Sequence, residues 1–272
     1  MKQLLIFGLG YTGKAIARAA LTQGWRITAT GRDGTLRFDD APAVLAAIGG
    51  ADAILSSVPP AQGLDPVLEA YGDALKGKRL AYLSSTGVYG DCGGAWVDES
   101  APVVGKGGTG RRAARAQADA AWLDLGAQVF RLPGIYGPPI DGQGGRSAFD
   151  RLREGRAHRV DLPDQIFSRI HVEDIASAVL LALESGAPAG AYNLADNLPA
   201  PQNAVIEEAC RLSGLPLPPL LSPQEVPPAS RAFYAENRRV ANGKARRMLG
   251  WAPRFGDYRS GLRAIWDEEA GV

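Results

Sequence analysis

A glycine-rich turn near the start of the chain constrains the fold more than any other feature. Gly8, Gly10 and Gly13 form a Gly-x-Gly-x-x-Gly pattern that follows the apolar run 4–7 and opens a segment with the apolar spacing of a helix. In this context the first glycine permits a tight turn, the second lets the backbone approach a pyrophosphate, and the third lets the helix pack closely on the strand. The free amides and dipole of a helix start favour an anion. The pattern predicts a strand–turn–helix motif that binds a dinucleotide pyrophosphate and also uses the backbone at Tyr11 and Thr12. The competing interpretation is a tight turn with a purely structural role.

Apolar runs and helical stretches alternate along the first half of the chain. We predict strands at 3–7, 26–30, 53–57, 79–84 and 128–131, and helices at 12–23, 42–48, 65–75 and 109–125. This alternation indicates an α/β fold, a doubly wound parallel sheet with helices on both faces. A helix at 172–184 and a strand at 191–194 predict that the chain returns to this sheet.

Segments rich in glycine and proline suggest how the chain is divided. Residues 134–145 and 215–228 cannot form regular helix. We therefore expect residues 1–136 with about 165–195 to form a dinucleotide-binding Rossmann domain. Residues from about 137 to 164 with 196–272 would form a smaller C-terminal substrate subdomain.

The residues at the end of the second predicted strand indicate whether the chain binds NAD or NADP. NAD-binding folds usually place an acid there, about 20 residues after the turn, on the ribose hydroxyls. This chain has Gly31 and Arg32, and a guanidinium can bind a 2′-phosphate bidentately. The pattern predicts NADP, with NAD as the alternative because Asp33 follows. Asp39, after a third strand expected at 36–38, is a candidate for the adenine amine, and Arg32 as an ordinary surface residue is the competing interpretation.

Charge and cysteine content argue against several classes of protein. The chain has 30 Lys and Arg against 29 Asp and Glu, so its net charge of +1 gives no general electrostatic reason to bind nucleic acid. The longest apolar run, 175–183, is too short to span a membrane, and no leader pattern is visible, so we expect a cytoplasmic protein with no membrane partner. Cys92 and Cys210 have no metal-spaced partner, which predicts neither a disulfide framework nor a metal site.

Five further short sequence motifs occur in an order that resembles a known protein family. They are SSTGVYG at 84–90, RLPGIYGP at 131–138, IHVEDI at 170–175, YNL at 192–194 and LGWAP at 249–253. Together with the glycine turn, this set resembles the extended short-chain dehydrogenase/reductase superfamily, in particular the NAD-dependent epimerase/dehydratase family. The resemblance covers nearly the whole chain, and it implies a Rossmann fold for NAD(P) with a small C-terminal domain that closes over the substrate.

The resemblance also implies roles for individual residues. The residues that would contact the cofactor beyond the glycine turn are Ser57, Val58, Pro59, Ser84 and Pro133, the last through its backbone beside the nicotinamide. Ser85 matches the catalytic Ser or Thr that hydrogen-bonds the substrate oxygen. A strand-end serine that satisfies turn amides is the competing interpretation of Ser85.

The acid/base pair of that family is missing. Its tyrosine precedes a lysine by four residues, and the neighbouring cation lowers the phenol pKa. None of the eight tyrosines here has that lysine, and Thr109 and Ala113 stand in the two places. Thr86 and Gly87 stand where dehydratases carry an extra Asp-Glu pair. The chain therefore resembles an atypical branch, in which ordinary carbonyl reduction, 4-epimerisation and dehydration are disfavoured.

Few residues could replace the missing pair. Tyr89 is the first candidate and His171 the second, although a histidine at a helix entrance is more often structural. Lys106 is a weaker candidate, and Arg111 and Arg169 are candidates for binding an anionic substrate.

Three functions remain open from the sequence. The leading one is an NADP-dependent oxidoreductase or epimerase-like enzyme acting on a hydroxyl or carbonyl of a sugar-like or small polar substrate. The alternative is a non-catalytic NADP-binding sensor or regulatory protein of the same fold. The third is an interaction module in which the helices expected at 65–75 and 109–125 pair to form a homodimer.

Overall fold

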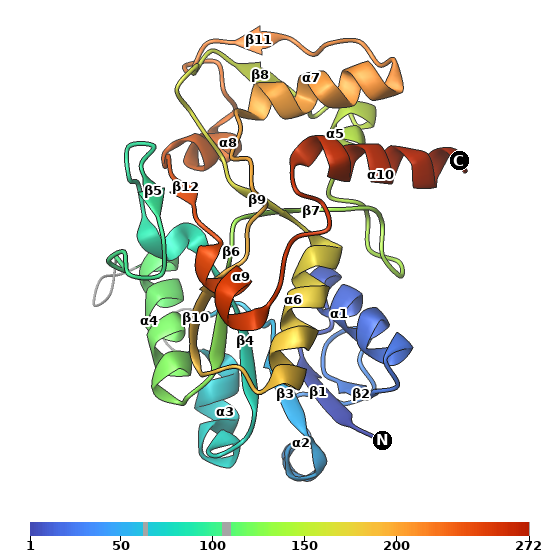
Figure 1. Ribbon diagram of the computed structural model, residues 1–272, viewed down its shortest axis with the longest axis vertical. Helices are drawn as coiled ribbons and strands as arrows, with labels where there is room; N and C mark the ends of the chain where they lie inside the picture. The colour runs from blue at the N-terminus through green and yellow to red at the C-terminus, as the bar shows by residue number, and fades with distance from the viewer. Residues whose placement is uncertain (62–64, 105–109, 272) are drawn as a thin grey trace.

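The computed structural model describes residues 1–61, 65–104 and 110–271 (Figure 1). Its strands are β1 (Gln3–Phe7), β2 (Arg26–Ala29), β3 (Ala53–Ser56), β4 (Leu80–Ser85), β5 (Trp96–Val97), β6 (Gln128–Leu132), β7 (Gly134–Tyr136), β8 (Arg159–Val160), β9 (Arg169–His171), β10 (Gly190–Asn193), β11 (Leu220–Leu221) and β12 (Arg239–Val240). Its α-helices are α1 (Tyr11–Thr22), α2 (Ala41–Gly50), α3 (Pro66–Leu75), α4 (Gly110–Asp124), α5 (Ala148–Arg153), α6 (Val172–Ser185), α7 (Gln202–Ser213), α8 (Pro228–Arg231), α9 (Gly243–Leu249) and α10 (Tyr258–Ala270). Short 3₁₀ turns span Thr86–Tyr89 and Ala232–Tyr234.

The centre of the molecule is a six-stranded sheet of order β10-β6-β4-β3-β1-β2. Every neighbouring pair in it is parallel, so the predicted doubly wound α/β sheet is confirmed. The third strand expected at 36–38 is wrong, because only an isolated bridge joins Thr30 to Leu36. Two parallel strands need a crossover of about a dozen residues, and the short stretch after β2 cannot provide one.

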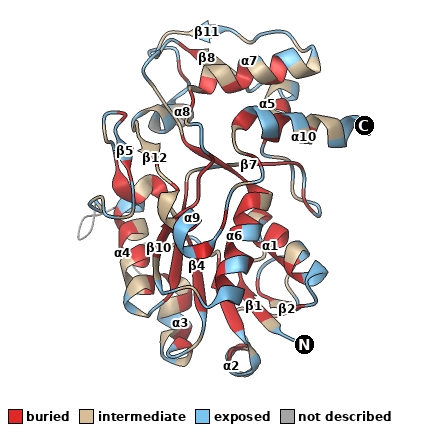
Figure 2. Ribbon diagram, viewed as in Figure 1, coloured by how far each residue is buried: buried red, intermediate tan, exposed pale blue. Residues whose placement is uncertain are grey.

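Alternate side chains of the strands point to opposite faces of this sheet, as the strand period requires. Leu4 and Ile6 of β1 belong to the buried cluster that α1 and α6 complete on one face. Leu5 and Phe7 belong to the cluster that α2, α3 and α4 complete on the other, where Trp122 of α4 is fully buried. The two helix layers flank the sheet in Figure 1, and the strands between them are buried in Figure 2. Because both faces are covered, only the ends of the strands can form an open site.

A third buried cluster lies beyond the sheet. It is built by β7, α5, α7 and α10 and contains Tyr136, Phe149, Val205, Leu262 and Ile265. In Figure 1 these elements stand above the ends of the sheet strands. The division into a domain of 1–136 with 165–195 and a subdomain of 137–164 with 196–272 stays a prediction.

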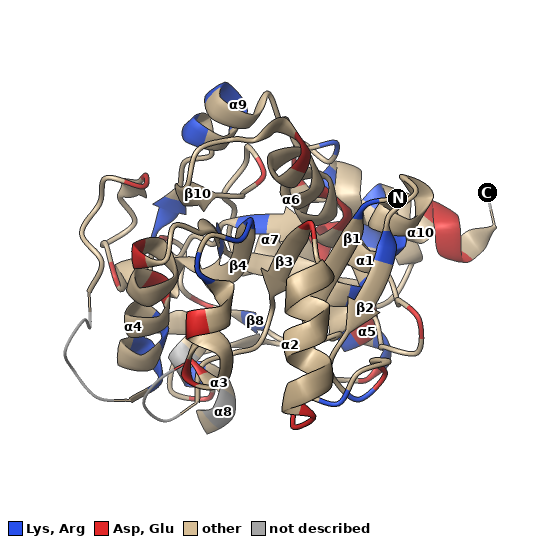
Figure 3. Cartoon of the chain, turned by 90° about the horizontal axis from the view of Figure 1, so that it is seen from below, with Lys and Arg blue, Asp and Glu red and all other residues tan. Residues whose placement is uncertain are grey.

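Basic and acidic segments are interspersed over the elements visible in Figure 3. Of the helices in the described ranges, none combines the length and the apolar character needed to cross a membrane.

Candidate functional site

The glycine turn leaves an open space at the start of α1. Gly8 has a φ of +87°, and a Cβ on Gly13 would lie 2.7 Å from the Gly8 carbonyl oxygen, so these two positions require glycine. A Cβ on Gly10 would meet nothing within 4 Å. Gly10 is also the N-cap of α1, and no side chain caps this helix. The first-turn amides, including those of Tyr11 and Thr12, therefore face a space that fits the pyrophosphate of a dinucleotide.

Residues after β2 and β3 hold this turn in place. The Gly8 amide donates to Thr30 Oγ1 at 3.2 Å, and the Ser57 hydroxyl donates to the Gly8 carbonyl. Val58 Cγ2 lies 3.1 Å from where a Gly8 Cβ would be, and Pro59 beside it is exposed. The predicted cofactor residues Ser57 and Val58 thus contact the turn itself.

The end of β2 carries the cationic groups expected near the adenosine. Arg32 is exposed and lines a shallow cavity of about 340 Å³ together with Asp39, which is ion-paired to Arg37 at 2.7 Å. Gly31 has a φ of +123°, and its Cβ would lie 2.9 Å from the Leu9 amide nitrogen. An acidic side chain at residue 31 would therefore be strained and would collide with the glycine turn.

Lys14 is a cation in this region that sequence reasoning missed. Its side chain is 8 % exposed, and its Nζ lies 2.5 Å from the Asp33 carboxylate. This contact lowers the pKa of Asp33 through a hydrogen bond and a coulombic interaction with Lys14. Lys14 also donates to the Asp141 carbonyl at 2.6 Å, and the Tyr11 hydroxyl donates to the Pro138 carbonyl at 2.9 Å. The loop after β7 is thus tied to the first turns of α1.

A second cavity, of about 390 Å³, lies at the carboxyl ends of β4 and β6. Parallel sheets place ligands in the crevice beyond these ends. The predicted residues Ser85, Pro133 and Arg169 all line it, together with Thr86, Leu132, Gly134, Ile135, Arg151, Ile166, Phe167, Ser168, Gln202, Phe233, Glu236, Arg238 and Val240. The Ser85 Oγ accepts a hydrogen bond from the Gly87 amide at 3.1 Å. Its own proton has no acceptor among the described residues, so it can donate to a substrate oxygen.

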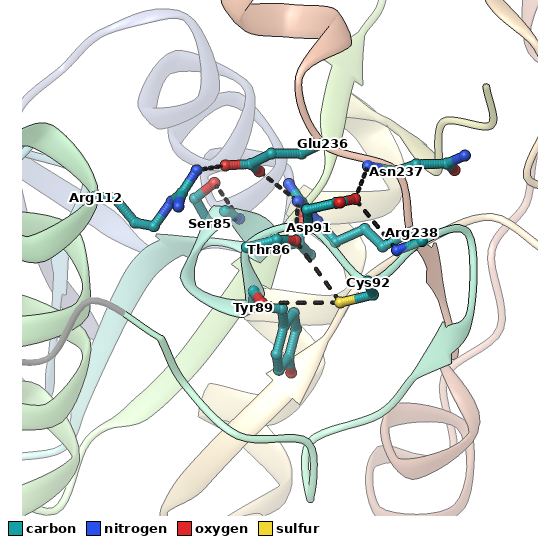
Figure 4. Close-up of polar contacts among 12 residues, drawn as sticks. Ser85, Thr86, Tyr89, Asp91, Cys92, Arg112, Glu236, Asn237 and Arg238 are labelled. Carbon is teal, nitrogen blue, oxygen red and sulfur yellow. Dashed lines mark hydrogen bonds and ion pairs between the residues drawn. The ribbon is translucent and has the colours of Figure 1, made fainter.

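A chain of ion pairs lies beside Ser85 (Figure 4). Glu236 accepts from Arg112 of α4 through one oxygen and from Arg238 through the other. Arg238 also donates to the Gly90 carbonyl at 2.6 Å. Arg111, the predicted anion-binding residue, is exposed and does not line the cavity. Its neighbour Arg112 is the residue of this helix that binds Glu236.

Tyr89 and Ser84 belong to a buried network below the cavity. The Tyr89 hydroxyl donates to Asn193 Oδ1 at 2.8 Å and accepts from Arg131 at 3.0 Å. Arg131 is ion-paired to Asp119 at 2.7 Å, and the Ser84 hydroxyl donates to Asp119 at 2.6 Å. Neither Tyr89 nor Ser84 lines the cavity, and burial raises the pKa of Tyr89. The geometry therefore argues against Tyr89 as a substitute acid or base and against Ser84 as a cofactor contact.

His171 is a buried cap of α6. Its Nδ1 accepts from the Glu173 amide at 3.3 Å, and its ring centroid lies 4.1 Å from that of Phe255. Burial, aided by Arg254, lowers its pKa to about 3. His171 also does not line the cavity, so the geometry gives it the structural role that was the alternative.

Two expected positions cannot be placed. Lys106 and Thr109 lie outside the described residues. Ala113, in the place of the family lysine, is buried in α4.

The structure adds site residues that carry no readable pattern in the sequence. Arg151, Gln202, Phe233 and Glu236 reach the cavity from α5, α7 and the segment before β12. These segments fall in the part of the chain that motif strings do not cover. Of the residues that the sequence analysis missed, Lys14 is the one that a motif could have indicated, because it directly follows the third glycine of the turn.

No protein-family model matches the chain. The solved structure of a functionally unknown conserved protein from Silicibacter pomeroyi DSS is 38 % identical, with a TM-score of 0.84 over 98 % of this chain and 99 % of that one. A Streptomyces protein named 3-diazoavenalumate denitrifying reductase is 30 % identical over 181 residues, which are 61 % of this chain and 58 % of that protein's length.

Two solved structures at lower identity share the fold. The dTDP-glucose 4,6-dehydratase of Bacillus anthracis in complex with NAD is 16 % identical, with a TM-score of 0.76 over 100 % of this chain and 97 % of that one. The human epimerase family protein SDR39U1 with NADPH is 17 % identical, with a TM-score of 0.75 over 97 % of this chain and 99 % of that one.

Proposed function

We propose that this chain is an NADP-dependent oxidoreductase of the extended short-chain dehydrogenase/reductase superfamily, in its NAD-dependent epimerase/dehydratase family, and that it acts on a hydroxyl or carbonyl of a small polar substrate. One observation carries the proposal. The open, uncapped glycine turn and the Ser85 cavity stand at the carboxyl ends of one parallel sheet, the edge where this architecture binds its ligands.

Three residues support NADP over NAD. Gly31 leaves no room for the acid that would hold ribose hydroxyls, and Arg32 presents a guanidinium beside it. Lys14 is ion-paired to Asp33, the acid that directly follows Arg32. When bound, the dinucleotide would supply hydride transfer, and the residues of the chain would only hold it and orient the substrate.

On the substrate side, Ser85 is the residue that we place on the reacting oxygen. Its free hydroxyl proton can donate to a carbonyl or alkoxide oxygen, and Pro133 lines the same cavity. Arg169 is buried on the far wall, where burial lowers its pKa to about 10, and it remains a cation near neutral pH. This arrangement supports the expectation that the substrate carries an anionic group.

A group that exchanges a proton with the substrate is still needed. Among the described residues that line the cavity, Glu236 is the carboxyl side chain, and Arg112 and Arg238 fix its orientation. We propose Glu236 for this role in place of Tyr89 and His171.

The second candidate function is a dinucleotide sensor without turnover. The observation that favours it is the loss of the tyrosine–lysine pair together with the burial of Tyr89 and His171 in the protein interior.

A homodimer through α3 and α4 also stays a proposal. A groove of about 590 Å³ lies over these helices, lined in part by Leu68, Tyr71 and Leu125.

The test combines binding with turnover. NADP and NAD affinities are measured by calorimetry, and oxidation of a panel of small hydroxy acids and alcohols is followed by NADPH absorbance. The proposal predicts tight NADP binding and turnover that Ser85→Ala and Glu236→Gln both lower, whereas Ser185→Ala at the exposed end of α6 does not. NADP binding with no turnover on any panel member supports the sensor instead.

A further inference from the structure

The inner wall of the cavity presents hydrogen-bond donors without acceptors. Arg169, 7 % exposed, donates through Nη1 to the carbonyls of Phe167 and Ala200 at 2.9 Å each, and through Nη2 to Gln202 Oε1 at 2.9 Å. A guanidinium has five N–H groups. Two of them therefore have no acceptor among the described residues.

Gln202 continues this set of donors. It is 5 % exposed and lines the same cavity, and its Nε2 has no hydrogen-bond partner in the described part of the chain. Because the Gln202 side-chain oxygen accepts from Arg169, the Gln202 amide nitrogen points away from Arg169. A buried N–H without a partner costs free energy unless a ligand or water satisfies it.

Arg151 of α5 adds a second guanidinium. It lines the cavity, and no hydrogen bond or ion pair joins its side chain to another described residue. Burial lowers its pKa, and its charge in turn lowers the pKa of Arg169, which places the two cations near each other.

No ion pair among the described residues joins a carboxylate to either guanidinium, and Asp150 favours the charged form of Arg151 only through a coulombic interaction without contact. Asp196 is the acid that most favours the charged form of Arg169, but it forms no ion pair with it, and burial raises the pKa of Asp196 to about 7. Two partly buried cations without a counter-ion are unfavourable in isolation. An anionic group of a ligand would satisfy both cations and the Gln202 amide together.

A flat apolar wall lies beside these donors. The rings of Phe167 and Phe233 are stacked, with centroids 4.3 Å apart and an interplanar angle of 10°. Phe233 is 46 % exposed, so its ring is open to a ligand, and Tyr234 packs edge-on against both rings. Such a surface favours a planar ring in offset stacking.

We propose that this cavity binds a small aromatic acid, with its carboxylate at Arg151, Arg169 and Gln202 and its ring along Phe233 and Phe167. The volume of about 390 Å³ is near the lower end of the range for ligand pockets, roughly 300–1,000 Å³, which suits a single-ring molecule better than a nucleotide-linked sugar. The inference rests on the proposed function, because the oxidised or reduced group of this acid would face Ser85.

The test is equilibrium binding to the full chain with and without NADP, followed by calorimetry. The probes are 4-hydroxycinnamate, its alcohol analogue 4-hydroxycinnamyl alcohol, cyclohexanecarboxylate, phenyl phosphate and UDP-glucose. We expect 4-hydroxycinnamate to bind about tenfold or more tightly than either the alcohol or the non-aromatic acid, since each lacks one of the two contacts. Tighter binding of phenyl phosphate than of the carboxylate identifies a phosphate ester as the source of the anion and overturns the carboxylate assignment.

Variants separate this inference from the function on which it rests. Arg151→Met should weaken 4-hydroxycinnamate about tenfold and leave NADP affinity unchanged, whereas Arg246→Met, at an exposed arginine of α9, should change neither. Gln202→Leu gives a second readout if Arg151→Met fails to fold. Binding of UDP-glucose more tightly than any acid, or an unchanged acid affinity in Arg151→Met, overturns the inference even when NADP binds. Acid binding without NADP binding instead overturns the proposed function alone.

Discussion

The Nζ of Lys14 lies 2.5 Å from the Asp33 carboxylate, and it bridges the first helix to the loop that follows β2. The ammonium is buried while the carboxylate is 43 % exposed, so the acid is the partner that solvent can reach. Without Lys14, an uncompensated negative charge would stand one residue from Arg32.

Lys14→Met should therefore weaken NADP binding about fivefold and leave NAD binding nearly unchanged. The reason is repulsion between Asp33 and a 2′-phosphate, and the effect is modest because interactions between exposed charges are screened by solvent. Calorimetry with both cofactors measures the ratio. The double variant Lys14→Met with Asp33→Asn should regain NADP affinity, and an equal loss for both cofactors in the single variant would contradict this account.

Arg32→Ala should lower NADP affinity by about one to two orders of magnitude, because a charge-assisted bidentate contact contributes roughly 1.5–3 kcal/mol. NAD affinity should stay the same. Arg26→Ala, at the exposed start of β2, is the matched control. Equal affinities of the unmodified protein for NADP and NAD would show that Arg32 does not bind the 2′-phosphate.

Gly10→Val should abolish dinucleotide binding with little loss of stability. A side chain at residue 10 enters open space, so it fills the cradle without striking the protein. Gly13→Val should also abolish binding, but it should destabilise the fold, since its Cβ would lie 2.7 Å from the Gly8 carbonyl oxygen. Calorimetry and thermal unfolding separate the two effects, and undiminished cofactor affinity in Gly10→Val would refute the cradle.

Asp119→Ala should lower the free energy of unfolding by about 3–5 kcal/mol, because it leaves Arg131 buried without its carboxylate. Ser84→Ala removes one hydrogen bond to the same carboxylate and should cost about 1.5–3 kcal/mol. Urea unfolding measures both. A loss below 1 kcal/mol for Asp119→Ala would show that the network relaxes.

His171 should make stability depend on pH in the acid range. Its folded pKa of about 3 is below the usual 6.5, so the unfolded chain binds the extra proton first. Its contribution is therefore complete above pH 6.5 and is lost as the pH falls toward 3, by up to roughly 4–5 kcal/mol. The difference in unfolding free energy between the unmodified protein and His171→Gln, measured from pH 8 to pH 4, should show this slope; a flat difference would mean that folding does not change the pKa of His171.

Local patterns predicted the parts of the molecule that follow from local physics. The apolar run 4–7 and the glycine spacing predicted β1, the turn and α1, because adjacent residues alone determine them. The strand expected at 36–38 failed because a crossover length, a non-local condition, decides whether a parallel strand can form.

The site was predicted only where a motif touches it. Ser85 and Pro133 lie in recognisable strings at the ends of β4 and β6, Arg169 directly precedes another at the start of β9, and all three line one cavity. Tyr89 and His171 lie in strings of the same kind, yet their side chains turn into the core, because Asn193, Arg131 and the α6 amide offer partners there. Arg151, Gln202 and Glu236 meet only through tertiary folding, which no spacing in the sequence encodes.

The chain returns to its central sheet late in the sequence, and this order affects folding during synthesis on the ribosome. One face of β1, β3, β4 and β6 is covered by α1 and α6, and β10 closes the edge beside β6, so these elements come from both sides of the long excursion through α5. Ribosomes add about 5–20 residues per second, so during synthesis the part of this apolar face that α6 covers stays exposed for several seconds after β6 has emerged. Chaperones that hold exposed apolar segments would find their binding sites here in that interval, before α6 covers them.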